Sequence, residues 1–364
     1  SLTTHQSLLP LPQKVVEKLG DAWVKKENYV GNGAYKLANH IVNEKIEFER
    51  NPLYWNDKET VINSATFLAI ENPSTDVARY RAGDLDITSY ALPPEQFAKL
   101  QKELPGEVFT TRTLATYSYE LNNKKAPFDN VNVRKALNLS LDRNVITDKV
   151  LGQGQTPTYV FTPTYIEEGH LIQQPAYSKE PMAQRNEEAI KLLEEAGYSK
   201  ANPLKFSILY NTNENHKKVA IAAASMWKAN TKGLIDVKLE NQEWKTYIDS
   251  RRAGRYDAAR AGWNADYNQA TTFGNYFLSN SSNNTAKYAN PEYDKAIAES
   301  YVATDAEGRA KAYAKAEEIL AKDFGIVPIF NYVNPRLVKP YVKGYSGKDP
   351  QDHIYLRNLY IIKH

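Results

Sequence analysis

The sequence predicts an α/β protein that folds into two compact units. Strand-like segments of alternating polarity are interleaved with segments of helical periodicity along most of the chain. The chain has 364 residues, whereas a compact domain commonly holds about 150, so one small domain does not accommodate it. Because no Gly/Ser-rich linker divides the sequence, we expect the chain to cross between the two units more than once.

Turn and capping residues define the limits of the predicted helices. Pro12 begins the first helix and Gly20 ends it. Ser74 or Thr75 caps a second helix, which Gly83 ends. Further helices are predicted where apolar residues recur at helical spacing, at residues 94–104, 131–151, 186–196, 216–232, 244–252, 291–303 and 306–322.

The predicted strands are half-buried or buried. Residues 45–50 alternate between polar and apolar side chains, and the turn pair Asn51-Pro52 ends this strand. The apolar run 326–330 is a buried strand, and Pro328 within it, which has no amide hydrogen, predicts an edge or a bulge. Strand-like patterns also occupy residues 61–70, 85–87, 108–121, 204–210, 235–239, 256–263 and 354–362.

The composition excludes several classes of protein. The 46 basic and 43 acidic residues are interspersed, with a formal net charge of +3, so neither nucleic acid nor a membrane surface is an expected partner. No stretch of about 18 apolar residues is present to span a bilayer, and Ser1–His5 lacks the character of a signal peptide. The absence of cysteine excludes thiolate metal sites and cysteine nucleophiles.

Catalytic motifs are also missing, which predicts that the protein is not an enzyme. Gly31 and Gly33 are followed by strand-like residues rather than by the start of a helix, so they form a turn and not a phosphate loop. The histidines are scattered without a His-Glu-x-x-His motif, and no Gly-x-Ser-x-Gly elbow is present. Asp84 and Asp86 flank a strand and are expected to be solvated. We expect no cofactor and no metal site.

The strongest binding signal is the segment from Arg260 to Asn268, which begins at the end of an apolar strand, where α/β folds place ligands. Arg260 offers a cation, Gly262 a backbone open to close approach, and Trp263 an aromatic wall. Asp266 supplies an anion, so a peptide with a charged carboxylate and a charged ammonium suits the segment. On spacing alone, an internal Arg260–Asp266 pair beside a core tryptophan explains the segment equally well.

Short motifs distributed in order along the whole chain are typical of one family. They occupy residues 30–35, 49–55, 79–86, 210–212, 216–218, 241–246, 260–268 and 336–340. Through these motifs the chain resembles the periplasmic oligopeptide-binding proteins of ABC importers, in the dipeptide/oligopeptide/nickel-binding family. The segment at 260–268 is specific to the oligopeptide branch, and murein-peptide-binding relatives usually depart from it around Gly262 and Trp263.

This resemblance implies a two-lobed periplasmic-binding-protein fold with mixed sheets and a ligand cleft between the lobes, in which an extended peptide binds. It implies that Asp266 binds the peptide ammonium. It also implies that Arg260, His216 and Arg251 bind the peptide carboxylate, with different partners for different peptide lengths. The other residues that it implies in ligand binding are Asn211, Trp244, Trp263, Glu120, Gly262 and Asn264.

Three departures from the family pattern bear on the ligand. Asn264 and Ala115 occupy positions where oligopeptide-binding relatives have a disulfide pair. Leu151 stands where a lysine is expected, and Arg252 stands where a histidine is expected. The charges that bind the peptide carboxylate, and with them the preferred peptide length, are therefore expected to differ from the family pattern.

The resemblance covers about the last two thirds of a full family member, judged against domain sizes. We expect residues 1–115 to form a partial first lobe, residues 116–333 a second, peptide-binding lobe, and residues 334–364 a return to the first lobe. A first lobe without its N-terminal strands would expose apolar edges. We therefore expect a fragment, or a chain completed by another one such as a missing N-terminal fragment of the same protein.

The expected function is to bind short oligopeptides in the periplasm of a Gram-negative bacterium and to deliver them to the membrane subunits of an ABC importer. Ligand binding would stabilise a closed arrangement of the lobes. The same fold could instead bind another ligand, such as murein peptide, haem, glutathione or nickel. Alternatives of another class are an uncharacterised peptidase and a chaperone-like protein that binds unfolded chains.

Overall fold

The computed structural model describes residues 5–364 and divides into two compact units. Unit 1 contains the residues up to Thr111 together with Asn334–His364, and unit 2 contains Arg112–Val333. The chain passes from unit 1 into unit 2 along strand β4 (Val108–Leu121) and returns along strand β9 (Ile326–Leu337). The chain thus crosses between the units twice.

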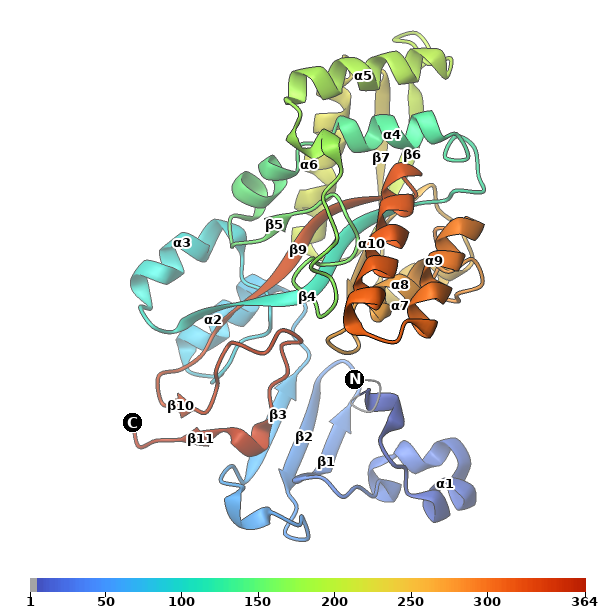
Figure 1. Ribbon diagram of the computed structural model, residues 1–364. Helices are drawn as coiled ribbons and strands as arrows, with labels where there is room; N and C mark the ends of the chain where they lie inside the picture. Colours follow the sequence, from blue (N-terminus) through green and yellow to red (C-terminus); the bar gives the residue numbers. More distant parts are fainter. Residues whose placement is uncertain (1–4) are drawn as a thin grey trace. The chain divides into compact units, whose positions relative to one another are not determined.

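A six-stranded mixed sheet forms the framework of unit 2 (Figure 1). Strand β6 runs parallel to β7 and β8, whereas β4 is antiparallel to β8 and β5 is antiparallel to β9. The expected α/β class with mixed sheets is confirmed. The strand order is β5-β9-β4-β8-β6-β7, with β5 at Thr156–Pro157, β6 at Leu204–Asn211, β7 at Ile235–Gln242 and β8 at Ala258–Asn264.

Helices cover both faces of this sheet. Ile208 belongs to a core shared with Trp227 of α6 (Glu214–Asn230). Its neighbour Leu209 belongs to a core shared with Tyr247 of α7 (Trp244–Arg252). Because successive strand residues point to opposite faces, α6 and α7 lie on opposite sides of the sheet. The other α-helices of unit 2 are α4 (Val131–Leu139), α5 (Met182–Glu195), α8 (Thr271–Gly274), α9 (Pro291–Val302) and α10 (Ala306–Lys322).

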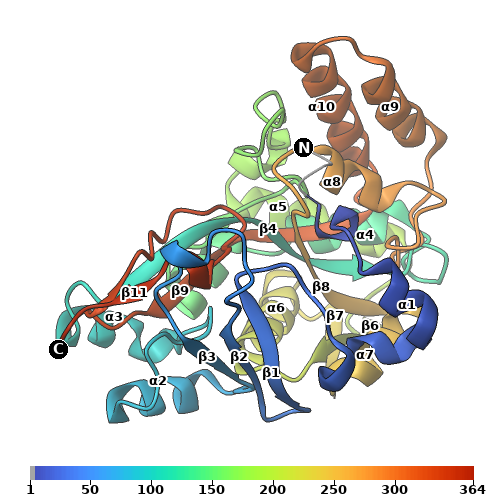
Figure 2. The ribbon, with the colours of Figure 1, turned by 90° about the horizontal axis from the view of Figure 1, so that it is seen from below.

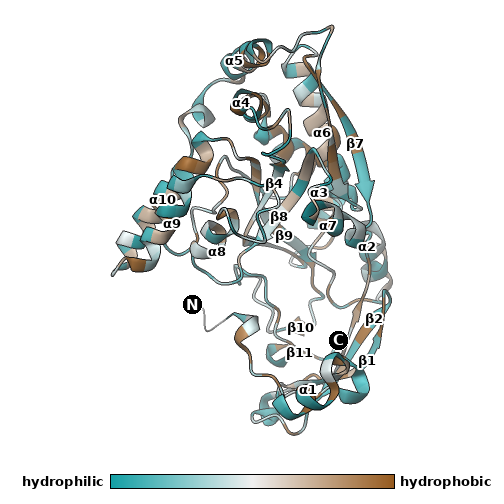
Figure 3. Ribbon diagram, turned by 90° about the vertical axis from the view of Figure 1, so that its right-hand side faces the viewer, coloured by the Kyte–Doolittle hydropathy of each residue, from teal (hydrophilic) through white to brown (hydrophobic). Residues whose placement is uncertain are grey.

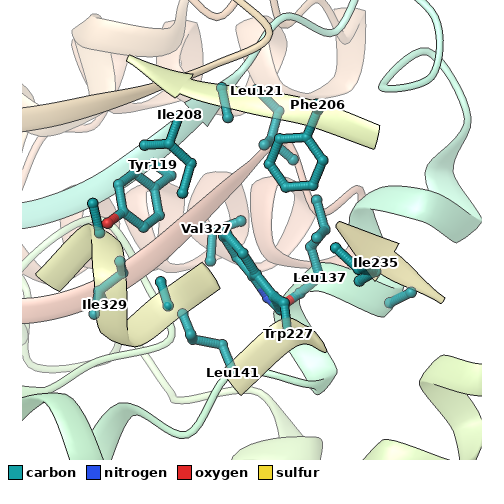
Figure 4. Close-up of a cluster of buried hydrophobic side chains, with 14 of the residues drawn as sticks. Tyr119, Leu121, Leu137, Leu141, Phe206, Ile208, Trp227, Ile235, Val327 and Ile329 are labelled. Atoms are coloured by element: carbon teal, nitrogen blue, oxygen red, sulfur yellow. The ribbon is translucent and has the colours of Figure 1, made fainter. Parts of the chain in front are cut away.

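The largest core lies between the sheet and helices α4, α5 and α6 (Figure 4). Trp227 is fully buried there, with its ring 5.9 Å from that of Tyr119 and 5.7 Å from that of Phe206. Its indole nitrogen donates to the carbonyl of Leu137 at 2.9 Å, which satisfies the one polar atom of the side chain. This core therefore fixes α4 and α6 against the sheet.

Helices α9 and α10 lie side by side (Figures 1 and 2) and enclose a second core with α8. Figure 3 shows hydrophilic and hydrophobic stretches alternating along both helices. Ile297 of α9 and Tyr313 of α10 are buried against Phe273 of α8 in this core. The pattern is that of amphipathic helices that turn one face to an apolar interior.

The single helix predicted over residues 131–151 is wrong, because the structure divides it. Helix α4 ends before Ser140, whose hydroxyl donates to the carbonyl of Ala136 at 2.7 Å. The carboxylate of Asp142 then accepts backbone amides at the beginning of a π-helical segment, η6 (Val145–Leu151). Short polar side chains that bond to the nearby backbone compete with a continuous helix in this way.

Unit 1 contains a three-stranded antiparallel sheet, seen side by side as β1, β2 and β3 in Figures 1 and 2. Helices α2 and α3 pack together through a core that includes Val77, Tyr80 and Leu100. The elements are β1 (Tyr35–Ile41), β2 (Lys45–Arg50), β3 (Ser64–Leu68), α1 (Gln13–Leu19), α2 (Pro73–Ala82), α3 (Pro94–Glu103), β10 (Val342–Lys343) and β11 (Tyr360–Ile361). The 3₁₀ turns of the two units are Gln6–Leu8, Gly20–Val24, Lys26–Asn28, Asp57–Glu59, Ala176–Lys179, Asn275–Phe277 and Leu356–Asn358.

Three predictions within unit 1 need correction. Asn72 caps α2, rather than Ser74 or Thr75, because its side-chain oxygen accepts the amides of both of those residues. The strand predicted at 85–87 is reduced to a single bridge between Ile87 and Val338, the residue directly after β9. The strand predicted at 354–362 is reduced to β11, because a 3₁₀ turn occupies the residues before it.

Pro328 lies within β9, in agreement with the prediction of a buried strand at 326–330, but β9 lies between β5 and β4 and is not the edge strand that Pro328 suggested. The two-residue strand β5 pairs with Phe330 and Asn331, and Pro328 precedes this short ladder. The carbonyl of Pro328 accepts a hydrogen bond at 2.7 Å from the side chain of Arg143, which is fully buried. The side chain of Arg143 thus bonds to β9 just before the residues that pair with β5.

Ala115 of β4 lies directly opposite Asn264 of β8 in the register of the sheet. The next pair along, Leu114 with Ala265, is hydrogen-bonded, since the amide of Ala265 donates to the carbonyl of Leu114 at 2.8 Å. Hydrogen-bonded and non-hydrogen-bonded pairs alternate, so the first pair is of the close kind, with Cα atoms about 4.5 Å apart. That separation lies within the range that a disulfide spans.

Joint substitution of Ala115→Cys and Asn264→Cys should give a disulfide that forms on oxidation. It should raise the free energy of unfolding by about 2–4 kcal/mol. Mass spectrometry and denaturant unfolding measure the two effects. Thr116→Cys with Asn264→Cys is the control, because residue 116 points to the other face of the sheet. Two free thiols persisting in the first pair under oxidising conditions would contradict this register.

Candidate functional site

The carboxyl ends of the parallel strands β6, β7 and β8 share one edge of the sheet in unit 2. Asn211 ends β6, and α6 follows at once with His216 in its first turn. Gln242 ends β7, and Trp244 is the first residue of α7. Strand β8 ends at Asn264. Ligands of α/β proteins bind at such an edge, toward which the N-termini of the helices also point.

Strand β8 loses one of its two neighbours at the point where the predicted binding segment begins. Strand β6 pairs only with the first two residues of β8, whereas β4 remains paired with β8 as far as Asn264. The amide of Ala265 donates to the carbonyl of Leu114, so the backbone groups of Ala265 point toward β4. Successive residues of an antiparallel strand point their backbone groups alternately toward and away from the partner strand. The backbone groups of Asn264 and Gly262 therefore point away from β4. Strand β8 therefore presents an edge to which an extended backbone can add.

Arg260 is a half-buried cation that neutral groups hold in place. Its Nη2 donates to the hydroxyl of Tyr332, and its Nη1 lies 3.5 Å from Oδ1 of Asn211. The guanidinium carbon lies 5.2 Å from the centre of the Tyr117 ring, and the hydroxyl of Tyr247 donates to the Arg260 carbonyl. Within residues 5–364, no acidic side chain forms an ion pair with Arg260. A partly desolvated cation without a counter-ion attracts an anionic ligand strongly.

His216 lies beside this cation and is neutral at physiological pH. Its ring centre lies 5.6 Å from that of Tyr117. Burial, followed by the positive charge of Arg260, holds the pKa of His216 well below the ordinary value of 6.5. The imidazole therefore offers hydrogen-bonding nitrogens to a ligand, while the positive charge of the cluster is that of Arg260.

Thr272 positions both Asp266 and Trp263. The indole nitrogen of Trp263 donates to the carbonyl of Thr272 at 3.0 Å, and the hydroxyl of Thr272 donates to the carboxylate of Asp266 at 3.1 Å. Arg260 and Asp266 do not form an ion pair with each other in the described chain. The internal Arg–Asp pair that the spacing left open is therefore wrong. The carboxylate of Asp266 lies on an exposed residue.

Glu120 and Arg251 lie in the interior of unit 2 and neutralise each other. Their side chains are 2.9 Å apart, with Glu120 fully buried and Arg251 nearly so. The hydroxyl of Tyr276 donates to Glu120 at 2.6 Å, and Thr285 donates to the same carboxylate. The resemblance implied that both charged residues face the ligand, whereas here each is occupied by the other. The charge of Arg251 is therefore matched within unit 2.

The remaining predicted residues lie at the carboxyl edge. Trp244 is 54% exposed and stacks on the ring of Tyr247 at 5.8 Å. The sequence argument missed Tyr117, Tyr332 and Thr272, which hold the predicted residues in place. The chain has 25 tyrosines, a composition that suits binding surfaces. Composition alone does not distinguish the tyrosines of the site from those of the core.

Two other features are absent among the described residues. Between residues 5 and 364, no group of three or more His, Cys, Asp or Glu side chains is placed to hold a metal ion. No helix in this part of the chain is both long and apolar enough to cross a membrane.

The sequence matches the model of the bacterial extracellular solute-binding proteins, family 5 (middle), over residues 3–285. The chain belongs to this family, and it is a solute-binding protein rather than an enzyme. It is similar to the periplasmic oligopeptide-binding protein OppA of Haemophilus influenzae, with 96% identity over 364 residues that cover 100% of this chain and 67% of that protein. OppA of Salmonella typhimurium is 54% identical over 363 residues, covering 100% of this chain and 66% of the relative.

A solved structure agrees with these matches. The crystal structure of the Haemophilus influenzae OppA complex with RPPGFSPFR matches with a TM-score of 0.96 at 96% identity, covering 100% of this chain and 71% of that one. The chain spans about two thirds of the length of the two curated relatives.

Glu120→Gln should destabilise unit 2 by about 3 kcal/mol, because it leaves the buried charge of Arg251 without a counter-charge. Denaturant unfolding measures the change. Addition of Arg251→Met to Glu120→Gln should restore part of the loss, since the unpaired charge is then removed. An unchanged midpoint in Glu120→Gln would contradict the assignment of a buried pair.

His216→Gln should weaken the pH dependence of stability below pH 6.5. The lowered pKa means that the unfolded chain binds more protons than the folded chain in the window below 6.5. The wild type therefore loses stability as the pH falls through that window, and it keeps this stability above it. Unfolding free energies measured from pH 7.5 to 5 test the slope, with His170→Gln, at an exposed residue, as the control. A slope that His216→Gln leaves unaltered would rule out this source of pH dependence.

Proposed function

We propose that this chain binds oligopeptides in the periplasm and delivers them to the membrane subunits of an ABC importer. The observation that carries the proposal is Arg260, a cation that has no carboxylate partner among the described residues and lies beside the open edge of β8. A peptide offers an anionic terminus and an extended backbone, which are the two complements of this arrangement. The similarity to OppA, whose structure holds a bound peptide, supports a peptide as the ligand.

The open edge of β8 accounts for binding that is independent of peptide sequence. An extended peptide pairs through its main chain with the backbone groups of Gly262 and Asn264. Main-chain hydrogen bonds are common to all peptides, so they add affinity without selecting side chains. Trp263, Trp244 and Asn211 then contact the peptide side chains from the same edge of the sheet.

The charged termini of the peptide are bound by different residues. Arg260 binds the carboxylate, with the neutral ring of His216 beside it as a hydrogen-bonding partner. Asp266, oriented by Thr272, binds the ammonium. The pair of Glu120 and Arg251 supports the sheet from within and does not contact the ligand, because its charges are already matched.

Delivery to an importer follows from a shift in population. A peptide that binds one conformation better than another increases the fraction of that conformation. The membrane subunits then recognise the peptide-loaded conformation. This transfer takes place in the periplasm, since both OppA relatives are periplasmic proteins by name.

Arg260→Gln should weaken binding of a tripeptide with a free carboxylate by about 2–5 kcal/mol, roughly 30-fold or more, because the carboxylate loses its charged partner. Binding of the same tripeptide with an amidated carboxyl terminus should change little. Isothermal titration calorimetry on the purified protein measures both affinities. Arg255→Gln removes an exposed cation that follows α7 and is the matched control.

Asp266→Asn should show the converse selectivity and weaken binding of peptides with a free ammonium more than that of N-acetylated ones. Comparable losses for both kinds of peptide would argue that Asp266 does not contact the ammonium.

Native mass spectrometry of the purified protein provides an independent check of peptide binding, since bound peptides appear as additional small masses that are released on mild denaturation.

A further inference from the structure

Gly262 leaves a space that the guanidinium of Arg260 occupies. The two residues lie two positions apart on β8 and therefore share one face of the strand. A Cβ atom at position 262 would lie 2.8 Å from Nη2 of Arg260 and 3.0 Å from the hydroxyl oxygen of Tyr332. The backbone of Gly262 is not in the left-handed region, so any residue could adopt it. Glycine at this position therefore provides space for the guanidinium of Arg260, rather than a special backbone conformation.

The other walls of this space come from two further strands. Tyr117 of β4 lies directly opposite Gly262 in the register, and its ring covers the guanidinium of Arg260. Tyr332 of β9, the strand beyond β4, accepts a hydrogen bond from the end of the guanidinium. The rings of Tyr117 and Tyr332 are themselves 5.8 Å apart. Three strands in sequence across the sheet thus hold one cation.

The groups that hold Arg260 are electrically neutral. A tyrosine hydroxyl accepts a hydrogen bond without cancelling the charge of the donor. Arg251, by contrast, is neutralised by the carboxylate of Glu120 in the same unit. Arg260 is therefore fixed in position while its charge stays available. A guanidinium fixed in this way loses less conformational freedom when it binds a carboxylate through two parallel hydrogen bonds.

We propose that Gly262 and Tyr332 are positioning residues, which hold the guanidinium of Arg260 ready for the peptide carboxylate and so set the preference for peptides with a free carboxyl terminus. This inference rests on the proposed function, since it assigns a cause to the recognition of the carboxylate by Arg260. Gly262 acts by having no side chain, and Tyr332 acts through its hydroxyl.

The test compares Gly262→Ala and Tyr332→Phe with the wild type. Trialanine and its carboxyl-terminal amide are the probes, and calorimetry on the purified protein gives both dissociation constants. Each variant should lose about 10-fold in affinity for the acid and less than about 3-fold for the amide, because only the acid uses the positioned charge. The double variant should lose less than the product of the two single losses, since both substitutions act on one guanidinium.

Thermal unfolding and a control variant separate positioning from a structural role. Melting temperatures should stay close to that of the wild type, since the two atoms crowded at position 262, Nη2 of Arg260 and the hydroxyl oxygen of Tyr332, are both at the ends of side chains rather than in the backbone. Tyr341→Phe removes a hydroxyl that bonds to Asp86 in unit 1, and it should leave the ratio of acid to amide affinity unchanged.

Retention of the wild-type ratio of acid to amide affinity by both Gly262→Ala and Tyr332→Phe would overturn the inference while leaving the proposed function intact. A wild type that binds the acid and the amide equally, or that binds neither, would instead overturn the role of Arg260 in the proposed function, and the inference with it.

Discussion

The antiparallel pairing of β4 with β8 determines the rest of the site. Its register sets Tyr117 opposite Gly262, and so places an aromatic ring against the guanidinium of Arg260. The same register aims the backbone groups of Gly262 and Asn264 away from β4. A slip of one residue would move every side chain of one strand to the other face, so the ring of Tyr117 would no longer lie against the guanidinium of Arg260. The burial of Glu120 in the adjoining core depends on the same pairing.

Two arginines of unit 2 differ in the groups that hold them, since one is paired with a carboxylate and the other is held by neutral groups. Arg251 is paired with Glu120 inside the fold, which removes the cost of leaving either charge unpaired. Among residues 5–364, Arg260 receives hydroxyl, amide and ring contacts and no carboxylate contact. These contacts fix its place but leave its charge unmatched, so the attraction remains for a carboxylate supplied from outside.

Local patterns in the sequence were sufficient for the class of fold. The periodicity of 291–303 and 306–322 predicted α9 and α10 within a residue. Arg260, predicted at the end of an apolar strand, is instead the third residue of β8, which continues to Asn264. The division near Ser140 was missed because side chains bonding to the backbone overrode helical periodicity.

The support for the site depends on strand pairing that local patterns do not contain. Tyr117, Gly262 and Tyr332 are far apart in the chain and meet only through the order of β4, β8 and β9. The most direct test of this account is a crystal structure of the protein with a bound tripeptide. The account predicts a carboxylate oxygen about 3 Å from the Arg260 guanidinium, with the peptide backbone hydrogen-bonded to Gly262 and Asn264. A peptide whose carboxylate contacts Arg251 instead, with the edge of β8 unoccupied, would contradict it.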